Sequence, residues 1–329
     1  MSGWPLGAQD RPVSRLCLGT WALSGLWGGQ TEPGVRAVRR AFDLGVNFFD
    51  TARAYGNGAA EAGLARGLGD LLRTHRSELV IATKGGLQAR RDTVVRNSDP
   101  EFLRASLVSS LRSLRTDHVD LYLLHYPDPT IPLAETAGVL AGFVAEGLVR
   151  HTGVSNFSAA QMSEFGSASV AQVPFNLLAR EVERDVLPHC QAAGTRVMGW
   201  SALAHGLLTG ALRPGHTFPQ DDWRAYSPVF QGERFAAVLA VVDRLKAFAA
   251  DLGISVAQLA LAWVLHHPAG IVPVVGAQVP EHIEDSVPAL EVRLSEADLA
   301  ELDRIVAAAP PVLAESEPPS RRKTTADAS

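Results

Sequence analysis

Eight short apolar runs recur along the chain, and longer stretches with helical periodicity lie between them. The runs do not alternate with polar residues, which is typical of parallel strands buried on both faces. They span residues 16–20, 46–50, 79–84, 119–125, 149–155, 170–175, 196–201 and 271–276. Helices are predicted between them, over residues 33–45, 98–114, 132–147 and 255–267. Eight strands, each followed by a helix, predict an α/β fold of the (β/α)8 TIM barrel type.

The length of the chain fits more than one domain organisation. A chain of 329 residues would allow two domains, but it also fits one barrel of about 250 residues or more. We expect a single (β/α)8 domain over residues 1–309, with a cap segment before the first strand. Residues 310–329 are rich in Pro, Ser and charged residues, and we expect this tail to be disordered.

Composition argues against several other classes of protein. The net charge of −5 gives no electrostatic reason to expect a nucleic-acid partner. No basic and apolar leader opens the chain, and no apolar run reaches the ~18 residues that span a bilayer. Cys17 and Cys190 cannot build a disulfide framework, and Cys17 is expected to be a small buried hydrophobe. We therefore expect a cytoplasmic protein without a membrane partner, and the oligomeric state stays open.

Ionisable residues stand where the predicted strands end. Asp50 ends the second strand, Lys84 the third and His125 the fourth. Taken singly, each has an ordinary structural interpretation: an Asp that caps a turn, a surface Lys and a hydrogen-bonded His. Active sites of (β/α)8 barrels lie at the carboxyl ends of the strands, where these three side chains must converge. Tyr55, five residues after Asp50, is expected to lie over the same end of the barrel.

The chemistry of these four side chains is coherent. A phenol has a pKa of about 10, which is too high for efficient proton transfer near neutral pH. We expect the ammonium group of Lys84 to lower the pKa of Tyr55, and Asp50 to hold Lys84 in place. His125 is expected to hydrogen-bond a substrate carbonyl oxygen. Such a set protonates a carbonyl oxygen, and because no side chain delivers hydride, a nicotinamide cofactor is implied.

The motifs that carry these residues resemble the aldo-keto reductase family, from about Leu16 to Ala307. "DTARAYG" is similar to the family's Asp and Tyr motif, "VIATKGG" to its Lys segment and "DLYLLHYPD" to its His segment. "RNSDPEFLRASLVSSLRSL" and "NLLARE" are closer to the bacterial branch near inositol-linked oxidoreductases and potassium-channel β-subunits. The resemblance implies a catalytic tetrad of Asp50, Tyr55, Lys84 and His125.

The same resemblance implies where the cofactor binds. "GVSNF" and Gln172 are similar to the pieces that hold the nicotinamide carboxamide in the family. "GWSALAHGLLTG" is similar to the segment that stacks an aromatic ring on the nicotinamide and wraps the pyrophosphate, and Trp200 stands where Tyr or Phe is usual. The implied cofactor-binding residues are Gly19, Thr20, Trp21, Ser155, Asn156, Gln172, Trp200, Ser201, Leu203, Gly206, Leu208, Gly276, Gln278, His282, Asp285 and Ser286.

The segment 274–286 resembles the family's adenosine-phosphate site, a loop that leads into a short helix. Members that prefer NADPH usually carry Lys or Arg where this chain has Gln278, and often Arg or Gln where it has His282. Ser286 stands in place of the usual Asn, and Glu281 adds negative charge. A phosphate dianion favours a cation or several donors. The resemblance therefore implies NADP(H) as the main cofactor, with a weak discrimination that leaves NAD(H) possible.

The substrate is expected to be a small-molecule carbonyl or alcohol, which the sequence does not name. Trp27 and Tyr126 are candidate substrate-binding residues. Three segments are expected to form the pocket: 23–29, 87–97 and 202–250, of which the last is predicted as a long irregular cover over the active site. Two sets have open interpretations. Trp223, Tyr226 and Phe230 are candidates to line the pocket, but Trp223 and Phe230 could instead anchor this cover. Arg90, Arg91 and Arg96 either meet an anionic or sugar substrate or form a solvated face.

Other functions are less compatible with the sequence. "GNGAAE" (56–61) nearly matches the dinucleotide motif G-x-G-x-x-G, but Glu61 stands where the third Gly permits close packing. No metal-binding pair of histidines ends a strand, and no G-x-S-x-G nucleophile motif occurs. A function from another class is a regulatory, β-subunit-like protein that binds the cofactor with little turnover. The intact tetrad favours an enzyme that reduces an aldehyde or ketone, or oxidises the matching alcohol.

Overall fold

The computed structural model describes residues 12–25, 31–90, 93–220, 222–310 and residue 312. Eight parallel strands form a closed barrel in the order β1-β10-β9-β8-β7-β6-β3-β2. Strand β1 closes it, because Cys17 pairs with Phe48 on one side and with Val274 on the other. The predicted (β/α)8 barrel is therefore confirmed. The barrel strands are β1 (Cys17–Gly19), β2 (Phe48–Asp50), β3 (Val80–Gly85), β6 (Val119–Leu124), β7 (Val149–Ser155), β8 (Val170–Pro174), β9 (Arg196–Trp200) and β10 (Val272–Gly276).

Each barrel strand is buried on two sides, which explains its continuous apolar sequence. Successive side chains of a strand point to opposite faces. Phe48 accordingly packs inside the barrel with Leu121 and Met198, whereas Phe49 packs outward among the residues that contact the helices. Cys17 is fully buried in the inner cluster, as predicted. The interior of the barrel is thus a packed apolar core below the site.

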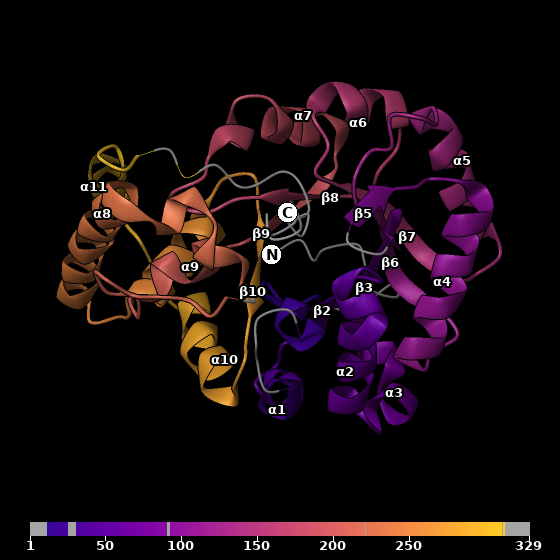
Figure 1. Ribbon diagram of the computed structural model, residues 1–329, viewed down its shortest axis with the longest axis horizontal. Helices are drawn as coiled ribbons and strands as arrows, with labels where there is room; N and C mark the ends of the chain where they lie inside the picture. Colours follow the sequence, from indigo (N-terminus) through magenta and orange to yellow (C-terminus); the bar gives the residue numbers. More distant parts are fainter. Residues whose placement is uncertain (1–11, 26–30, 91–92, 221, 311, 313–329) are drawn as a thin grey trace, which may run out of the picture.

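The helices surround the strands, with α1–α3 at the bottom of Figure 1, α4 and α5 on the right, α6 and α7 at the top, and α8, α9 and α11 on the left. The four predicted helices are present, each within about two residues of its expected bounds. Their starts follow local rules: Asp99 caps α4 by accepting from the Phe102 N–H, and Ser255 and Gln258 form a capping box on α9. The helices are α1 (Thr31–Asp43), α2 (Ala59–Leu68), α3 (Leu71–Thr74), α4 (Pro100–Leu114), α5 (Leu133–Ala145), α6 (Ala159–Phe165), α7 (Val186–Ala193), α8 (Gly232–Asp251), α9 (Val256–His266), α10 (Pro280–Ser286) and α11 (Glu296–Val306).

Two segments differ from the prediction. The expected loop 87–97 contains an antiparallel hairpin of β4 (Leu87–Arg90) and β5 (Thr93–Arg96). The expected irregular cover 202–250 is irregular only as far as residue 231, because α8 forms its second part. Phe235, Val238, Leu239, Val242 and Leu245 form the buried stripe of α8 with helical spacing. This amphipathic pattern was present in the sequence and outweighs the argument from segment length.

The ends of the predicted domain lie partly outside the described residues. Residues 1–11 of the expected cap segment and residues 311 and 313–329 of the expected disordered tail are not described. Val312 is described, and it is buried against the core. The domain boundary at residue 309 stays a prediction. Within the described ranges no single helix is long and apolar enough to cross a membrane, and only α8 and α9 together, bent by 86°, meet that length and composition.

Candidate active site

A cleft of about 670 Å³ opens at the carboxyl ends of the barrel strands. Asp50 is the last residue of β2, His125 follows β6, and Trp200 is the last residue of β9. All three line the cleft together with Tyr55. Lys84, near the end of β3, is buried and reaches the same point from below. The structure therefore brings the four predicted catalytic side chains together.

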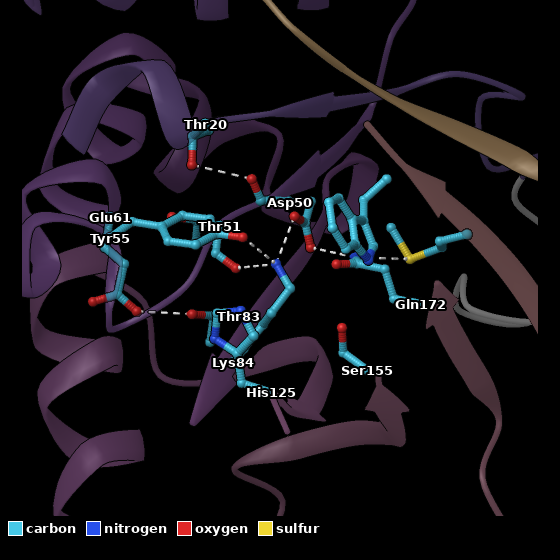
Figure 2. A network of polar contacts seen from close by, with 12 residues as sticks. Thr20, Asp50, Thr51, Tyr55, Glu61, Thr83, Lys84, His125, Ser155 and Gln172 are labelled. Carbon is cyan, nitrogen blue, oxygen red and sulfur yellow. Dashed lines mark hydrogen bonds and ion pairs between the residues drawn. The ribbon is translucent and has the colours of Figure 1, made fainter. Parts of the chain in front are cut away.

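Lys84 is the centre of the polar network drawn in Figure 2. Its Nζ atom donates to Asp50 Oδ2 at 2.6 Å, to the Thr51 carbonyl oxygen at 3.0 Å and to the Tyr55 hydroxyl at 3.2 Å. The Gln172 amide donates to the other carboxylate oxygen of Asp50 at 2.8 Å. All three protons of the ammonium group therefore have acceptors. A buried ion pair needs such additional bonds to offset the loss of water.

The pKa values of this cluster follow from burial and from neighbouring charges. Burial alone would lower the pKa of Lys84, but the carboxylate of Asp50 and the hydroxyl of Tyr55 raise it above its ordinary value. Lys84 is therefore a cation at neutral pH. Burial raises the pKa of Tyr55, and the charge of Lys84 only partly opposes this. The predicted net lowering of the Tyr55 pKa is thus wrong in the protein without ligand, because desolvation of the phenolate outweighs the ammonium charge.

The turn that carries Tyr55 has a backbone that glycine makes possible. Gly56, Asn57 and Gly58 have φ values of 60°, 51° and 91°. A Cβ atom on Gly56 would collide with the Ser24 carbonyl oxygen, so a side chain is excluded there on two grounds. Three consecutive left-handed residues turn the chain sharply into α2. The sharp turn leaves the Tyr55 ring over the end of the barrel.

Aromatic rings pack around the Tyr55 hydroxyl. The Tyr55 ring meets Trp21 edge to face at 4.8 Å between centroids and His125 at 5.7 Å. Tyr126 stacks on His125 at 5.4 Å. Burial, together with the charge of Lys84, lowers the pKa of His125 well below its usual value, so its imidazole is neutral. Its Nδ1 atom is buried without a hydrogen-bond partner among the described residues.

Amide and hydroxyl groups line the neighbouring wall of the cleft. Asn156 donates through Nδ2 to the His125 carbonyl oxygen at 3.0 Å and to Ser155 Oγ at 3.1 Å. Trp200 donates through Nε1 to Asn156 Oδ1 at 3.1 Å. Gln172 also lines the cleft, and its amide nitrogen bonds Asp50. Three polar groups of this wall make no hydrogen bond among the described residues. They are the Ser155 hydroxyl proton, one lone pair of Asn156 Oδ1 and the Gln172 carbonyl oxygen.

The far end of the cleft is formed by the loop after β10 and by α10. Gln278, His282, Asp285 and Ser286 line it, as does Glu281. The Gln278 N–H donates to His282 Nδ1 at 3.3 Å, and Asp285 accepts from the Ser255 hydroxyl at 3.2 Å. No Lys or Arg from this segment lines the cleft within the described ranges. This end of the cleft is therefore polar but has no cation of its own.

The remaining predicted site residues fall into three groups. Gly19, Thr20, Trp21, Ser201, Leu203, Gly206 and Gly276 line the cleft, as does Tyr126. Leu208 does not line it, because its side chain is fully buried in the hydrophobic core. Trp27 lies outside the described residues, and so does Arg91.

The structure places four of the residues with open interpretations, whereas the side chain of Arg90 lies outside what it describes. Trp223 lines the cleft, Phe230 is buried in the core and Tyr226 is exposed. Arg96 lies with its guanidinium over the Tyr126 ring, 5.2 Å from the centroid, and is not part of the cleft lining. Its charge contributes to the lowered pKa of Asp128, after the hydrogen bonds that this carboxylate accepts from Thr130 and Ser98. Arg96 therefore interacts with Tyr126 and Asp128 rather than with the cleft.

Several residues of the segment after β9 line the cleft without a role predicted from the sequence, and His205, Trp223 and Arg224 among them form a cluster. His205 meets the Trp223 ring edge to face at 4.8 Å between centroids. Arg224 donates to the His205 carbonyl oxygen at 3.1 Å and pairs with the buried Asp222 at 2.6 Å. The Asp-Arg spacing in "DDWRAY" was the available signal. This cluster fixes the segment against the cleft.

Glu61 was also missed, because it was considered only as a defect in a dinucleotide motif. It is fully buried on α2 and accepts a hydrogen bond from the Thr83 hydroxyl at 2.8 Å. It also pairs with Arg53 at 3.4 Å. Thr83 precedes Lys84, and Arg53 precedes Tyr55 by two residues. Glu61 therefore links the segments that carry Lys84 and Tyr55.

His205 gives the site a pH-dependent contribution to stability. Burial and the charge of Arg224 lower its pKa to about 4. Between about pH 6.5 and pH 4 the unfolded chain binds a proton that the folded chain does not. The free energy of unfolding therefore decreases as the pH is lowered through this range. Relative to His205→Asn, which tolerates the left-handed backbone, the wild type should lose about 2 kcal/mol of unfolding free energy over this range. Urea titrations at both pH values measure this difference.

His216→Gln serves as the control, because His216 is exposed. Its loss of stability on acidification should match that of the wild type. Equal pH slopes for the wild type and His205→Asn would contradict the prediction.

We looked for side chains that could bind a metal ion in the described part of the chain. No group of three or more His, Cys, Asp or Glu side chains there is arranged to hold a metal ion.

Comparison with known proteins places the chain in a family. The model of the aldo/keto reductase family matches residues 15–307, nearly the whole described part of the chain. The chain belongs to the aldo/keto reductase family. Aldo-keto reductase YhdN of Bacillus subtilis (strain 168) is 36% identical over 278 residues, 83% of each chain. NADH-specific methylglyoxal reductase of Escherichia coli (strain K12) is 32% identical over 314 residues, 89% of this chain and 95% of its own.

Solved structures of aldo/keto reductases agree with the fold. The glycerol dehydrogenase AKR11B4 from Gluconobacter oxydans is 35% identical, with a TM-score of 0.83 over 92% of this chain and 94% of its own. An aldo/keto reductase from Klebsiella pneumoniae in complex with NADP and acetate is 31% identical, with a TM-score of 0.69 over 91% and 93% of the two chains. The predicted family is confirmed, and the chain is an NAD(P)(H)-dependent oxidoreductase of this family.

Proposed function

We propose that this aldo/keto reductase reduces an aldehyde or ketone, or oxidises the matching alcohol, with Tyr55 as the general acid or base. One observation carries the proposal: Lys84 Nζ bonds both the Asp50 carboxylate and the Tyr55 hydroxyl at the floor of the cleft. A phenol in contact with a fixed cation can give up its proton to a substrate, because the phenolate that remains is stabilised. General acid catalysis of this kind contributes typically 10²- to 10⁴-fold.

The cofactor supplies hydride when it is bound, and the chain offers groups that fit its carboxamide. The Ser155 hydroxyl has a proton to donate, while Asn156 Oδ1 and the Gln172 carbonyl oxygen have lone pairs to accept. A primary amide presents one acceptor oxygen and two donor hydrogens, which this set complements. Trp200 adds a flat aromatic face at the same wall. These four residues would hold the nicotinamide end of the cofactor.

The protonation states support reduction as the easier direction near neutral pH. The raised pKa of Tyr55 keeps the phenol protonated, which is the form that donates to a carbonyl oxygen. The lowered pKa of His125 keeps the imidazole neutral, so that one ring N–H can hold the carbonyl oxygen without adding positive charge. Alcohol oxidation needs the phenolate of Tyr55, and the same pKa shift makes this form scarce until the pH is high.

The far end of the cleft supports the use of NAD(H) as well as NADP(H). By the family resemblance, Gln278 and His282 stand where a 2′-phosphate would call for a cation, and Glu281 and Asp285 line the same end of the cleft. One relative is named an NADH-specific reductase, whereas a solved relative contains NADP. We propose that this chain accepts both cofactors, with less discrimination for NADPH than a member with Lys or Arg at residue 278.

Gln278→Arg should lower KM for NADPH because it supplies a guanidinium where the 2′-phosphate is expected. A charge-assisted bond of about 1.5–3 kcal/mol corresponds to a change of roughly 10-fold or more in KM. KM for NADH should not change, since NADH lacks the phosphate. Gln278→Leu is the control that removes the amide without adding charge. An unchanged ratio of kcat/KM values for NADPH and NADH would contradict this assignment.

The substrate is proposed to be a small aldehyde or ketone. Aromatic and apolar side chains line the cleft together with Tyr55, with Leu87 and Val94 of the β4–β5 hairpin among them. Two relatives are named for methylglyoxal and for glycerol, a carbonyl compound and a polyol. A panel of aliphatic, aromatic and polyhydroxylated aldehydes, assayed by oxidation of NADH and NADPH, tests the function. Cofactor binding without turnover of any member would favour the regulatory, β-subunit-like alternative.

A further inference from the structure

Trp200 presents two different chemical features to the cleft. Its ring is part of the wall, and its indole N–H donates to Asn156 Oδ1 at 3.1 Å. The residues are 44 positions apart: Trp200 ends β9, and Asn156 directly follows β7. A phenylalanine ring would provide the flat face without this donor. The two features can therefore be separated by one substitution.

The indole N–H helps to decide which way round the Asn156 amide stands. Asn156 Nδ2 donates to the His125 carbonyl oxygen at 3.0 Å and to Ser155 Oγ at 3.1 Å. An amide rotated by half a turn would place its NH2 against the indole N–H and its oxygen against the His125 carbonyl oxygen. Both contacts would be repulsive. The network thus fixes one orientation of an amide whose two ends are otherwise similar in shape.

The backbone of Asn156 is held as firmly as its side chain. Its φ of 63° lies in the left-handed region, which asparagine tolerates better than most residues. Its N–H donates to the Gln172 carbonyl oxygen at 3.0 Å. Asn156 therefore connects the ends of β6, β7, β8 and β9 at one point of the wall. Within the described residues, Oδ1 accepts one hydrogen bond, so one of its two lone pairs is left to accept from a ligand.

We propose that the Trp200 indole N–H is a positioning group for the cofactor: it holds the Asn156 amide so that the free lone pair of Oδ1 accepts from the nicotinamide carboxamide. This inference rests on the proposed function for the identity of the ligand. Its consequence is that the nicotinamide ring is kept in one of its two flipped orientations. The hydride that the bound cofactor supplies would then come from one face of the ring.

Trp200→Phe tests the proposal because it keeps the ring and removes the donor. We expect the Kd for NADPH or NADH, measured by calorimetry, to rise about 2- to 10-fold, the change that one hydrogen bond supports. We also expect the transfer of deuterium from cofactor labelled on one face of C4 to lose its stereospecificity in part. Trp263→Phe, at a buried tryptophan stacked on Phe175, is the matched control and should change neither measurement.

A double-mutant cycle with Asn156→Ala separates this proposal from the function itself. If the indole acts through Asn156, the effects of Trp200→Phe and Asn156→Ala on cofactor Kd are not additive. Additive effects, or an unchanged Kd with full stereospecificity in Trp200→Phe, would overturn the proposal, even if the melting temperature falls. Because the cycle uses binding alone, it decides the proposal even if no carbonyl substrate is turned over.

Discussion

Tyr55→Phe is expected to lower kcat for carbonyl reduction by about 10²- to 10⁴-fold, because it removes the only proton donor that contacts Lys84 in the proposed mechanism. The ring packs edge to face against Trp21 and His125, and phenylalanine keeps both contacts. Cofactor Kd should therefore stay unchanged. Steady-state assays with the best carbonyl substrate, together with calorimetric titration of the cofactor, provide the two measurements.

Tyr226→Phe is the matched control for the loss of a phenol, since Tyr226 is exposed and does not line the cleft. It should retain the wild-type kcat. Near-normal turnover in Tyr55→Phe would rule out Tyr55 as the general acid. A wild type that binds cofactor tightly and turns over no substrate would instead support the regulatory alternative.

Lys84→Met should be the most destabilising single change at the site. It leaves the buried Asp50 carboxylate without its cation, 2.6 Å away in the wild type. Removing one partner of a buried ion pair costs about 3–5 kcal/mol, because the other charge stays buried and unpaired. Turnover should also be lost, since the Tyr55 phenolate would lack its stabilising charge. Urea denaturation followed by fluorescence measures the stability.

The double variant Asp50→Asn/Lys84→Met separates charge from packing. Replacing the carboxylate by a neutral amide should restore most of the stability lost in Lys84→Met, while turnover stays absent. A double variant as unstable as Lys84→Met would show that the loss comes from packing around the lysine stem. A stable Lys84→Met would show that Asp50 does not need its partner.

The strand-end residues could be predicted because their positions depend on local features. Each apolar run ends at a recognisable residue, and parallel strands that close a barrel must bring their carboxyl ends to one place. The convergence of Asp50, Lys84 and His125 could therefore be predicted without any knowledge of side-chain contacts. Trp200 ends another predicted strand and lines the cleft for the same reason, whereas Gly19 was assigned from the family resemblance.

Features that depend on packing could not be predicted in the same way. The direction of the Tyr55 pKa shift depends on how completely the phenol is buried, and the bond between Trp200 and Asn156 joins residues from separate strands. The sequence interpretation compared Glu61 only with the dinucleotide motif. Its contacts to Thr83 and Arg53 form only when α2 packs on β3. The helix α8 could have been predicted, because its periodicity is visible in the sequence. The length of the segment was instead taken to indicate an irregular cover.

The apolar filling of the barrel determines how the active site is resupplied with protons. Phe48, Leu121 and Met198 pack in the interior of the barrel, whereas Tyr55 lines the open cleft. In the proposed mechanism, a proton lost from Tyr55 is therefore replaced from water in the cleft. Because substrate and product would use the same cleft, we expect the acid to be recharged after the product has left.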